Sequence, residues 1–144
     1  MNNNFGQLII GSIPIGFESI NVEMKEAILT SDYILCERKK DLIYLFYALN
    51  KIKTKAIIAT YDEINPDQAL NLIKSNKKIL LTTECGYPGI ADPGSPYISL
   101  CHSNKIDVSI ISGPSIATIA FSASGFQTNK KGCLLYTSDA ADEG

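Results

Sequence analysis

Five short apolar runs alternate along the chain with five segments whose apolar residues recur at helical spacing. The apolar runs are Leu8–Ile13, Tyr33–Cys36, Ala56–Ala59, Lys78–Thr83 and Val108–Ile111. Runs of this length are typical of buried strands. Strands that alternate with helices pair in parallel, because each helix returns the chain to the starting edge of the sheet. The pattern therefore predicts an α/β fold with a mostly parallel five-stranded sheet and flanking helices.

The helical segments carry start signals of their own. Ser19 or Asn21 is placed to cap the first helix, and Asn65 followed by Pro66 is a strong start for another. Between them, the segment after Asp41 has one apolar face at helical spacing. This face consists of Leu42, Leu45, Phe46 and Leu49.

The stretch from Glu84 to Pro96 is a long loop that follows the fourth apolar run. It holds three glycines and three prolines in thirteen residues, so it continues neither a strand nor a helix. A second loop, from Ser112 to Ile116, also follows an apolar run and also opens onto a helical segment. In open α/β sheets, ligands bind where such loops leave the carboxyl ends of the strands.

Composition excludes some classes of function and leaves others open. The 144 residues suit one ordinary domain. A net charge of −2 gives no basic stripe of the kind that favours nucleic-acid binding. A basic face or a further domain could still bind RNA. The four cysteines show no paired spacing, so no metal site or disulfide framework is expected. No stretch is long enough to span a membrane, and we expect a cytoplasmic protein.

Several common catalytic signatures are missing. No Gly-x-Gly-x-x-Gly follows the first apolar run, and no Walker A lysine motif is present. The single histidine, His102, has no partner spacing, so a surface or packing role is favoured over a base or ligand. What remains is a set of shaped loops that would hold a ligand by backbone groups, which suits a cofactor that carries its own leaving group.

Three loops in this order resemble the motifs of the tetrapyrrole methylase superfamily, which comprises S-adenosylmethionine-dependent transferases. The loops are Ile13–Gly16, Cys85–Gly94 and Gly113–Ser115. The chain looks most like the branch that methylates the 2′-hydroxyl of a cytidine in small-subunit ribosomal RNA. The resemblance covers Leu8 to Phe126, and the ordered set is far more specific than any one loop.

The resemblance implies particular roles for residues of this chain. It implies S-adenosylmethionine as cofactor, small ribosomal subunit RNA as partner, and no association with a membrane. It also implies a two-domain enzyme, which as a complete protein could form a homodimer. It also implies cofactor contacts at Ile15, Gly86, Tyr87, Ile90, Ser115 and Ile116. Ser115 also suits a plain helix cap. Glu37 is the one candidate for the base that takes the hydroxyl proton.

Two departures from the ribosomal branch fall on the side that would face the acceptor. The branch has an acidic-threonine-arginine run where this chain has Glu37 followed by Arg38-Lys39-Lys40. A solvated cluster of charges at the surface would also explain these residues. The branch has aspartate-alanine-glycine-threonine-proline where this chain has Glu84–Pro88. Three alternatives therefore stay open: a tetrapyrrole acceptor, a diphthine-type acceptor, or a non-catalytic ligand-binding or scaffold domain.

The last twelve residues, Cys133 to Gly144, resemble the translation of a sequencing adapter. We therefore interpret residues 1–132 as the N-terminal domain of a methylase truncated before its second domain, and residues 133–144 as a non-native tail. A fragment with one wall of the cofactor cleft is expected to be inactive alone.

Deletion of residues 133–144 is expected to leave the free energy of unfolding unchanged, because an adapter-derived tail has no evolved packing partner. Equilibrium denaturation of the two chains measures the difference. A loss above roughly 1 kcal/mol, the typical effect of a single contact, would show that the tail docks on the domain.

Overall fold

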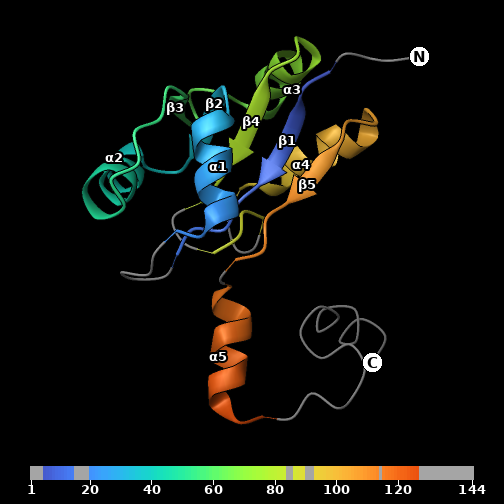
Figure 1. The fold of residues 1–144 in the computed structure, drawn as a ribbon. Helices are drawn as coiled ribbons and strands as arrows, with labels where there is room; N and C mark the ends of the chain where they lie inside the picture. Colours follow the sequence, from blue (N-terminus) through green and yellow to red (C-terminus); the bar gives the residue numbers. More distant parts are fainter. Residues whose placement is uncertain (1–4, 15–19, 84–85, 90–92, 114, 127–144) are drawn as a thin grey trace, which may run out of the picture.

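A computed structural model describes residues 5–14, 20–83, 86–89, 93–113 and 115–126 of the chain. The strands are β1 (Gln7–Ile10), β2 (Tyr33–Cys36), β3 (Ile57–Thr60), β4 (Lys78–Leu81) and β5 (Val108–Ile110). The helices are α1 (Val22–Thr30), α2 (Lys39–Ile43) with its continuation η1 (Tyr44–Leu49), α3 (Pro66–Lys74), α4 (Ser95–Ser103) and α5 (Ile116–Ser124). Strands and helices alternate throughout, as the apolar runs predicted (Figure 1).

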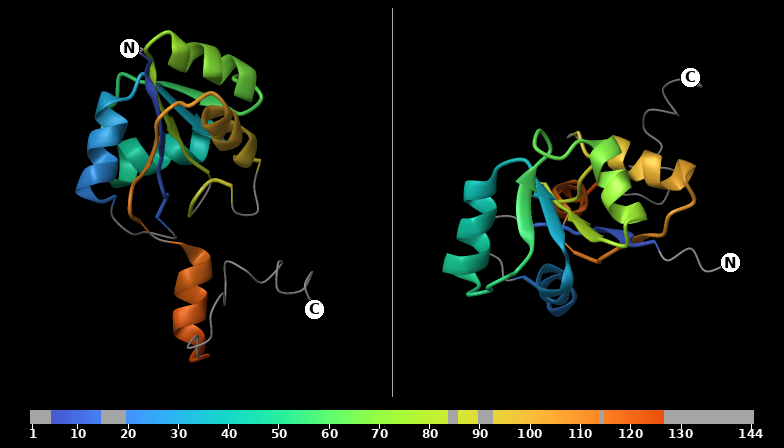
Figure 2. Two further views of the ribbon diagram at one scale, coloured as in Figure 1. Left: turned by 90° about the vertical axis from the view of Figure 1, so that its right-hand side faces the viewer. Right: turned by 90° about the horizontal axis from the view of Figure 1, so that it is seen from above.

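The five strands form one parallel sheet in the order β3-β2-β4-β1-β5. The chain thus steps from β1 across to β2 and β3, then returns to insert β4 between β2 and β1, and ends with β5 on the other side of β1. Right-handed crossovers in two opposite directions place their helices on opposite faces of the sheet. Accordingly, α1 and α2 cover one face and α3 and α4 cover the other (Figure 2).

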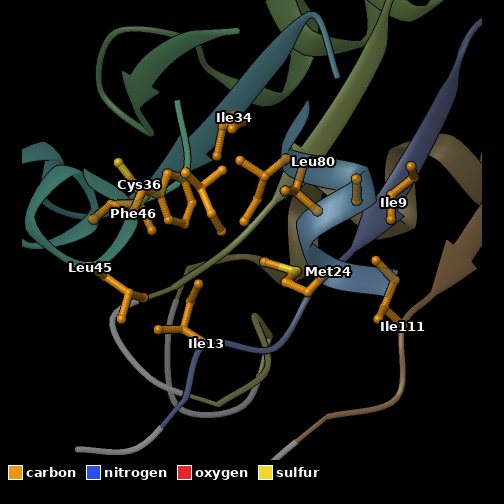
Figure 3. Close-up of a cluster of buried hydrophobic side chains, with 13 residues drawn as sticks. Ile9, Ile13, Met24, Ile34, Cys36, Leu45, Phe46, Leu80 and Ile111 are labelled. Carbon is orange, nitrogen blue, oxygen red and sulfur yellow. The ribbon is translucent and has the colours of Figure 1, made fainter. Parts of the chain in front are cut away.

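Two apolar cores result, one under each pair of helices. Neighbouring residues of a strand point to opposite faces, so Ile34 joins the core under α1 and α2, whereas Leu35 joins the core under α3 and α4. Both side chains are fully buried. In the first core, Phe46 packs near Ile34 and Leu80 (Figure 3). Burial on both faces explains why the strands read as apolar runs without alternation.

The helix starts follow the expected capping chemistry. The Asn21 side chain accepts a hydrogen bond from the Met24 amide at 2.8 Å, so Asn21 rather than Ser19 is the cap of α1. At α3, Asn65 and Gln68 form a reciprocal capping box, with both hydrogen bonds at 2.9 Å and Pro66 in the first turn.

The expected apolar face after Asp41 is only partly confirmed. Leu42, Leu45 and Phe46 are buried, but Leu49 is exposed. The helix changes at Tyr44 from α to π geometry, and the Asn50 amide bonds back to the Leu45 carbonyl at 3.2 Å. The wider π turn rotates the last residues away from the core, and the 3.6-residue period of the sequence gave no sign of it.

The last helix, α5, departs from the expectation that all helices pack on the sheet. It extends away from the sheet (Figures 1 and 2), and Ile119 and Phe126 are 45% and 76% exposed. Ile110, at the end of the edge strand β5, is also 65% exposed. This end of the described chain therefore leaves apolar surface open.

None of the helices in the described ranges is long and apolar enough to cross a membrane. Within the same ranges, no group of three or more His, Cys, Asp or Glu side chains could hold a metal ion.

Replacement of Asn65 by alanine is expected to lower the free energy of unfolding by about 1 kcal/mol, because it removes the acceptor of the capping box. Thermal or urea denaturation measures this loss. Asn71→Ala is the matched control, since Asn71 is an exposed residue inside the same helix. An equal effect of both variants would contradict the role of the cap.

Candidate cofactor and acceptor site

The connections after neighbouring strands leave the sheet toward opposite faces. The chain leaves β4 toward the face covered by α3 and α4, whereas it leaves the neighbouring strands β1 and β2 toward the face covered by α1 and α2. Connections that part in this way open a crevice at the carboxyl edge of the sheet, where α/β proteins bind ligands. The loop that begins after β4 therefore lies at the centre of the candidate site.

The loop after β4 is fixed to the loop after β1 by a pair of backbone hydrogen bonds. The Ile13 amide donates to the Gly86 carbonyl at 3.0 Å, and the Gly86 amide donates to the Ile13 carbonyl at 2.8 Å. Gly86 is buried and has a φ of 73°, a conformation that side chains of L-residues disfavour. The glycine is therefore required at this position by the backbone itself.

A second contact fixes the same loop to the loop after β5. The Tyr87 hydroxyl donates to the Ile111 carbonyl at 2.7 Å and lies 3.4 Å from the Gly113 carbonyl. Gly113 packs so closely that an added Cβ would lie 2.8 Å from the Ser12 Cβ. The loops after β1, β4 and β5 thus form one connected cradle.

The cradle is anchored in the core below it. Ile13 and Ile111 follow the ends of β1 and β5, and they are only 3% and 8% exposed. Both belong to the core under α1 and α2 (Figure 3). Asn21 adds a further tie, because its side-chain amide donates to the Ser112 carbonyl at 2.8 Å while its oxygen caps α1.

The start of α5 has amide donors that its own cap residue does not engage. Ser115 occupies the cap position, but it makes no capping hydrogen bond, and the cap interpretation of its hydroxyl is therefore not supported. Its carbonyl accepts from the Thr118 hydroxyl at 3.0 Å. Open amides and the helix dipole at this point suit a carboxylate or a nucleoside hydroxyl.

Glu37 lies at the carboxyl end of β2, beside β4. Its carboxylate is half-buried and accepts a hydrogen bond from the Thr83 hydroxyl, which is 5% exposed. Thr83 was not singled out from the sequence. Only the pairing of β2 with β4 brings together two residues that are 46 positions apart.

Two of the basic residues after Glu37, Arg38 and Lys39, are engaged with acids at the surface. Lys39 pairs with Glu63 at 2.6 Å, and this hydrogen bond lowers the pKa of Glu63. Arg38 pairs with Asp41 at 3.0 Å, with both side chains more than half exposed. These contacts agree with the solvated-cluster interpretation.

Neither of the described cysteines nor the histidine supplies a reactive group here. Burial raises the pKa of Cys36 to about 11 and also raises that of Cys101, so both thiols stay protonated at neutral pH. His102 is an exposed residue of α4. These findings agree with the interpretation that the site works through shaped loops.

The structure brings some of the expected site residues together and does not describe others. Gly86 and Tyr87 are joined directly to the loops after β1 and β5, and Ser115 follows Gly113 by two positions. For Ile116, only the backbone at the start of α5 is described. Ile15 and Ile90 lie outside the described residues.

No protein-family model matches the chain. Among solved structures, the fold is similar to the crystal structure of uroporphyrin-III-C-methyltransferase from Thermus thermophilus, with a TM-score of 0.56 over 90% of this chain and 56% of that chain. The two sequences are 14% identical, so this similarity concerns the fold alone. The fold is thus an α/β domain like that of this methyltransferase.

Two proteins named ribosomal RNA small subunit methyltransferase I are similar to the chain in sequence. The protein from Thermotoga maritima is 34% identical over 130 residues, which cover 87% of this chain and 57% of the relative. The protein from Leptospira biflexa is 30% identical over 126 residues, which cover 86% and 52%. The chain is thus a relative of these methyltransferases, which confirms the resemblance inferred from its three loops. It spans about half the length of the curated relatives it matches.

Replacement of Gly86 by alanine is expected to lower the free energy of unfolding by about 1–2 kcal/mol, the usual penalty for a left-handed L-residue. Equilibrium denaturation measures the loss. Gly125→Ala measures the penalty of the left-handed backbone by itself, because φ is 76° there and no atom of the described residues lies within 4 Å of the added carbon. If Gly86→Ala is as stable as the parent, the backbone at residue 86 is not constrained as described.

Proposed function

We propose that the chain is part of an S-adenosylmethionine-dependent methyltransferase that methylates the 2′-hydroxyl of a cytidine in small-subunit ribosomal RNA. The similarity to ribosomal RNA small subunit methyltransferase I over 87% of the chain carries this proposal. The cradle at the carboxyl edge of the sheet supports it, because ligands of α/β proteins bind there.

The cradle fits a flat polar cofactor. Gly86 and Gly113 let the loops of the cradle pack closely, and the start of α5, which the Ser115 side chain does not cap, offers amide donors. We therefore assign the cofactor contacts to Gly86, Tyr87 and Ser115, together with Ile15, Ile90 and Ile116. S-adenosylmethionine would supply an electrophilic methyl group at this place.

Glu37 is the candidate for the group that takes the proton from the acceptor hydroxyl. It lies at the same edge of the sheet as the cradle, and the buried Thr83 hydroxyl holds its carboxylate. A carboxylate held in one orientation can accept a proton while the acceptor and the methyl group are aligned. The exposed residues Arg38 and Lys40 follow Glu37 in the chain and are candidates to contact a phosphate of an RNA acceptor.

We also propose that the complete protein has a second domain that closes the cofactor cleft, with residues 1–132 as the first domain. The relatives are about twice as long as the matched part, and apolar surface stays open around α5 and at Ile110. Such surface is typical of a site that another part of the protein covers. Residues 133–144, the proposed non-native tail, lie outside the described residues.

The test of this function uses the complete gene product with labelled S-adenosylmethionine and two acceptors, unmethylated small ribosomal subunits and a porphyrin. Methyl transfer to the 2′-hydroxyl of a ribosomal cytidine is the expected result. Transfer to the porphyrin alone would overturn the acceptor assignment, and cofactor binding without transfer to any acceptor would indicate a scaffold domain.

Glu37→Gln in the complete protein is expected to lower turnover by about 100-fold or more, because the amide cannot accept the proton, while affinity for the cofactor stays the same. Glu26→Gln is the matched control, since Glu26 is an exposed residue of α1. Single-turnover kinetics separate the chemical step from binding. Unchanged turnover in Glu37→Gln would remove this residue from the mechanism.

A further inference from the structure

The Tyr87 side chain joins two loops whose strands are not neighbours. In the sheet, β1 lies between β4 and β5, so a contact from the loop after β4 to the loop after β5 must pass over the end of β1. The Tyr87 hydroxyl makes this contact through the Ile111 carbonyl at 2.7 Å. We infer that Tyr87 is a positioning residue, which fixes the shape of the cradle rather than offering its hydroxyl to the ligand.

The hydroxyl of Tyr87 has a single hydrogen, and the contact with the Ile111 carbonyl uses it. The Gly113 carbonyl, at 3.4 Å, is the more distant of its two acceptors. The phenol therefore keeps no second hydrogen to donate to a ligand while this bond stands. This differs from a direct polar contact with the cofactor.

Both ends of the connection are anchored. Ile111 is 8% exposed, and its amide donates to the Ile10 carbonyl at 2.9 Å, so its carbonyl is a rigid acceptor. Gly86, the residue before Tyr87, is held by two hydrogen bonds to Ile13. Two consecutive residues of one loop are thus fastened to the loops after two different strands.

The backbone below the Tyr87 hydroxyl is closely packed, so the length of this side chain decides whether it reaches its acceptor. Gly113 lies against Ser12, and a Cβ at position 113 would be 3.8 Å from the Tyr87 hydroxyl oxygen and 2.8 Å from the Ser12 Cβ. A short side chain at position 87 would not reach across the end of β1 to the Ile111 carbonyl.

The inference rests on the proposed function only where it calls the cradle a cofactor site, so the experiment has two arms. The first arm is amide hydrogen exchange on the 144-residue chain and on Tyr87→Phe, which keeps the ring and removes the donor. The amides of Ile13 and Gly86 are expected to exchange about three- to tenfold faster in Tyr87→Phe, the effect of one hydrogen bond. Amides in the middle of β1 and β4 are expected to be unchanged.

Tyr47→Phe is the matched control. The Tyr47 hydroxyl also donates to a backbone carbonyl, that of Thr54 at 3.3 Å, but it lies on η1 away from the cradle. This variant is expected to leave exchange at Ile13 and Gly86 as in the parent chain. Equal exchange in Tyr87→Phe and Tyr47→Phe would overturn the inference, whatever the protein binds.

The second arm repeats the exchange measurement on the complete gene product with S-adenosylhomocysteine present. We expect S-adenosylhomocysteine to slow the exchange of the cradle amides in the parent protein. In Tyr87→Phe, we expect this protection factor to be at least threefold smaller. Equal protection in the two proteins would show that the connection does not shape the cofactor site. If the parent shows no protection at millimolar ligand, the proposed function fails, and the first arm still decides whether Tyr87 holds the loops together.

Discussion

The reversal of direction between β3 and β4 is the constraint on which the rest of the structure depends. The chain first builds the sheet outward on one side, and then returns to insert β4 between β2 and β1. Right-handed crossovers convert this reversal into helices on both faces. The same step makes the loop after β4 the centre of the site, since the connections on either side of it leave toward the other face.

The cradle gains its rigidity from ties of different kinds at one edge of the sheet. A backbone bridge joins Ile13 to Gly86, the Tyr87 hydroxyl reaches Ile111, and Asn21 holds the Ser112 carbonyl. A site that binds a ligand through backbone groups needs such ties, because the positions of backbone donors are set by the loops themselves. The edge of the sheet near Glu37 is built differently: there, Thr83 holds one carboxylate, and Arg38 and Lys39 are paired with acids at the surface.

Much of the site became visible only through long-range pairing. Gly86 was expected at the site from its motif, but its positive φ and its bridge to Ile13 depend on β1 and β4 being neighbours. Thr83 carried no signal of its own, because its partner Glu37 is 46 positions away. Leu49 shows the opposite case: its spacing predicted burial, and a local π turn placed it at the surface.

The sequence by itself determined the class of fold, since five apolar runs alternating with helical segments permit a parallel sheet and little else. It also determined the helix start at Asn65, because capping depends on residues three positions apart, whereas it left Ser19 and Asn21 open for α1. The tertiary structure alone decided the strand order, and with it which loops meet. Contacts such as Tyr87 with Ile111 join segments far apart in the chain, and no local pattern encodes a distance between them.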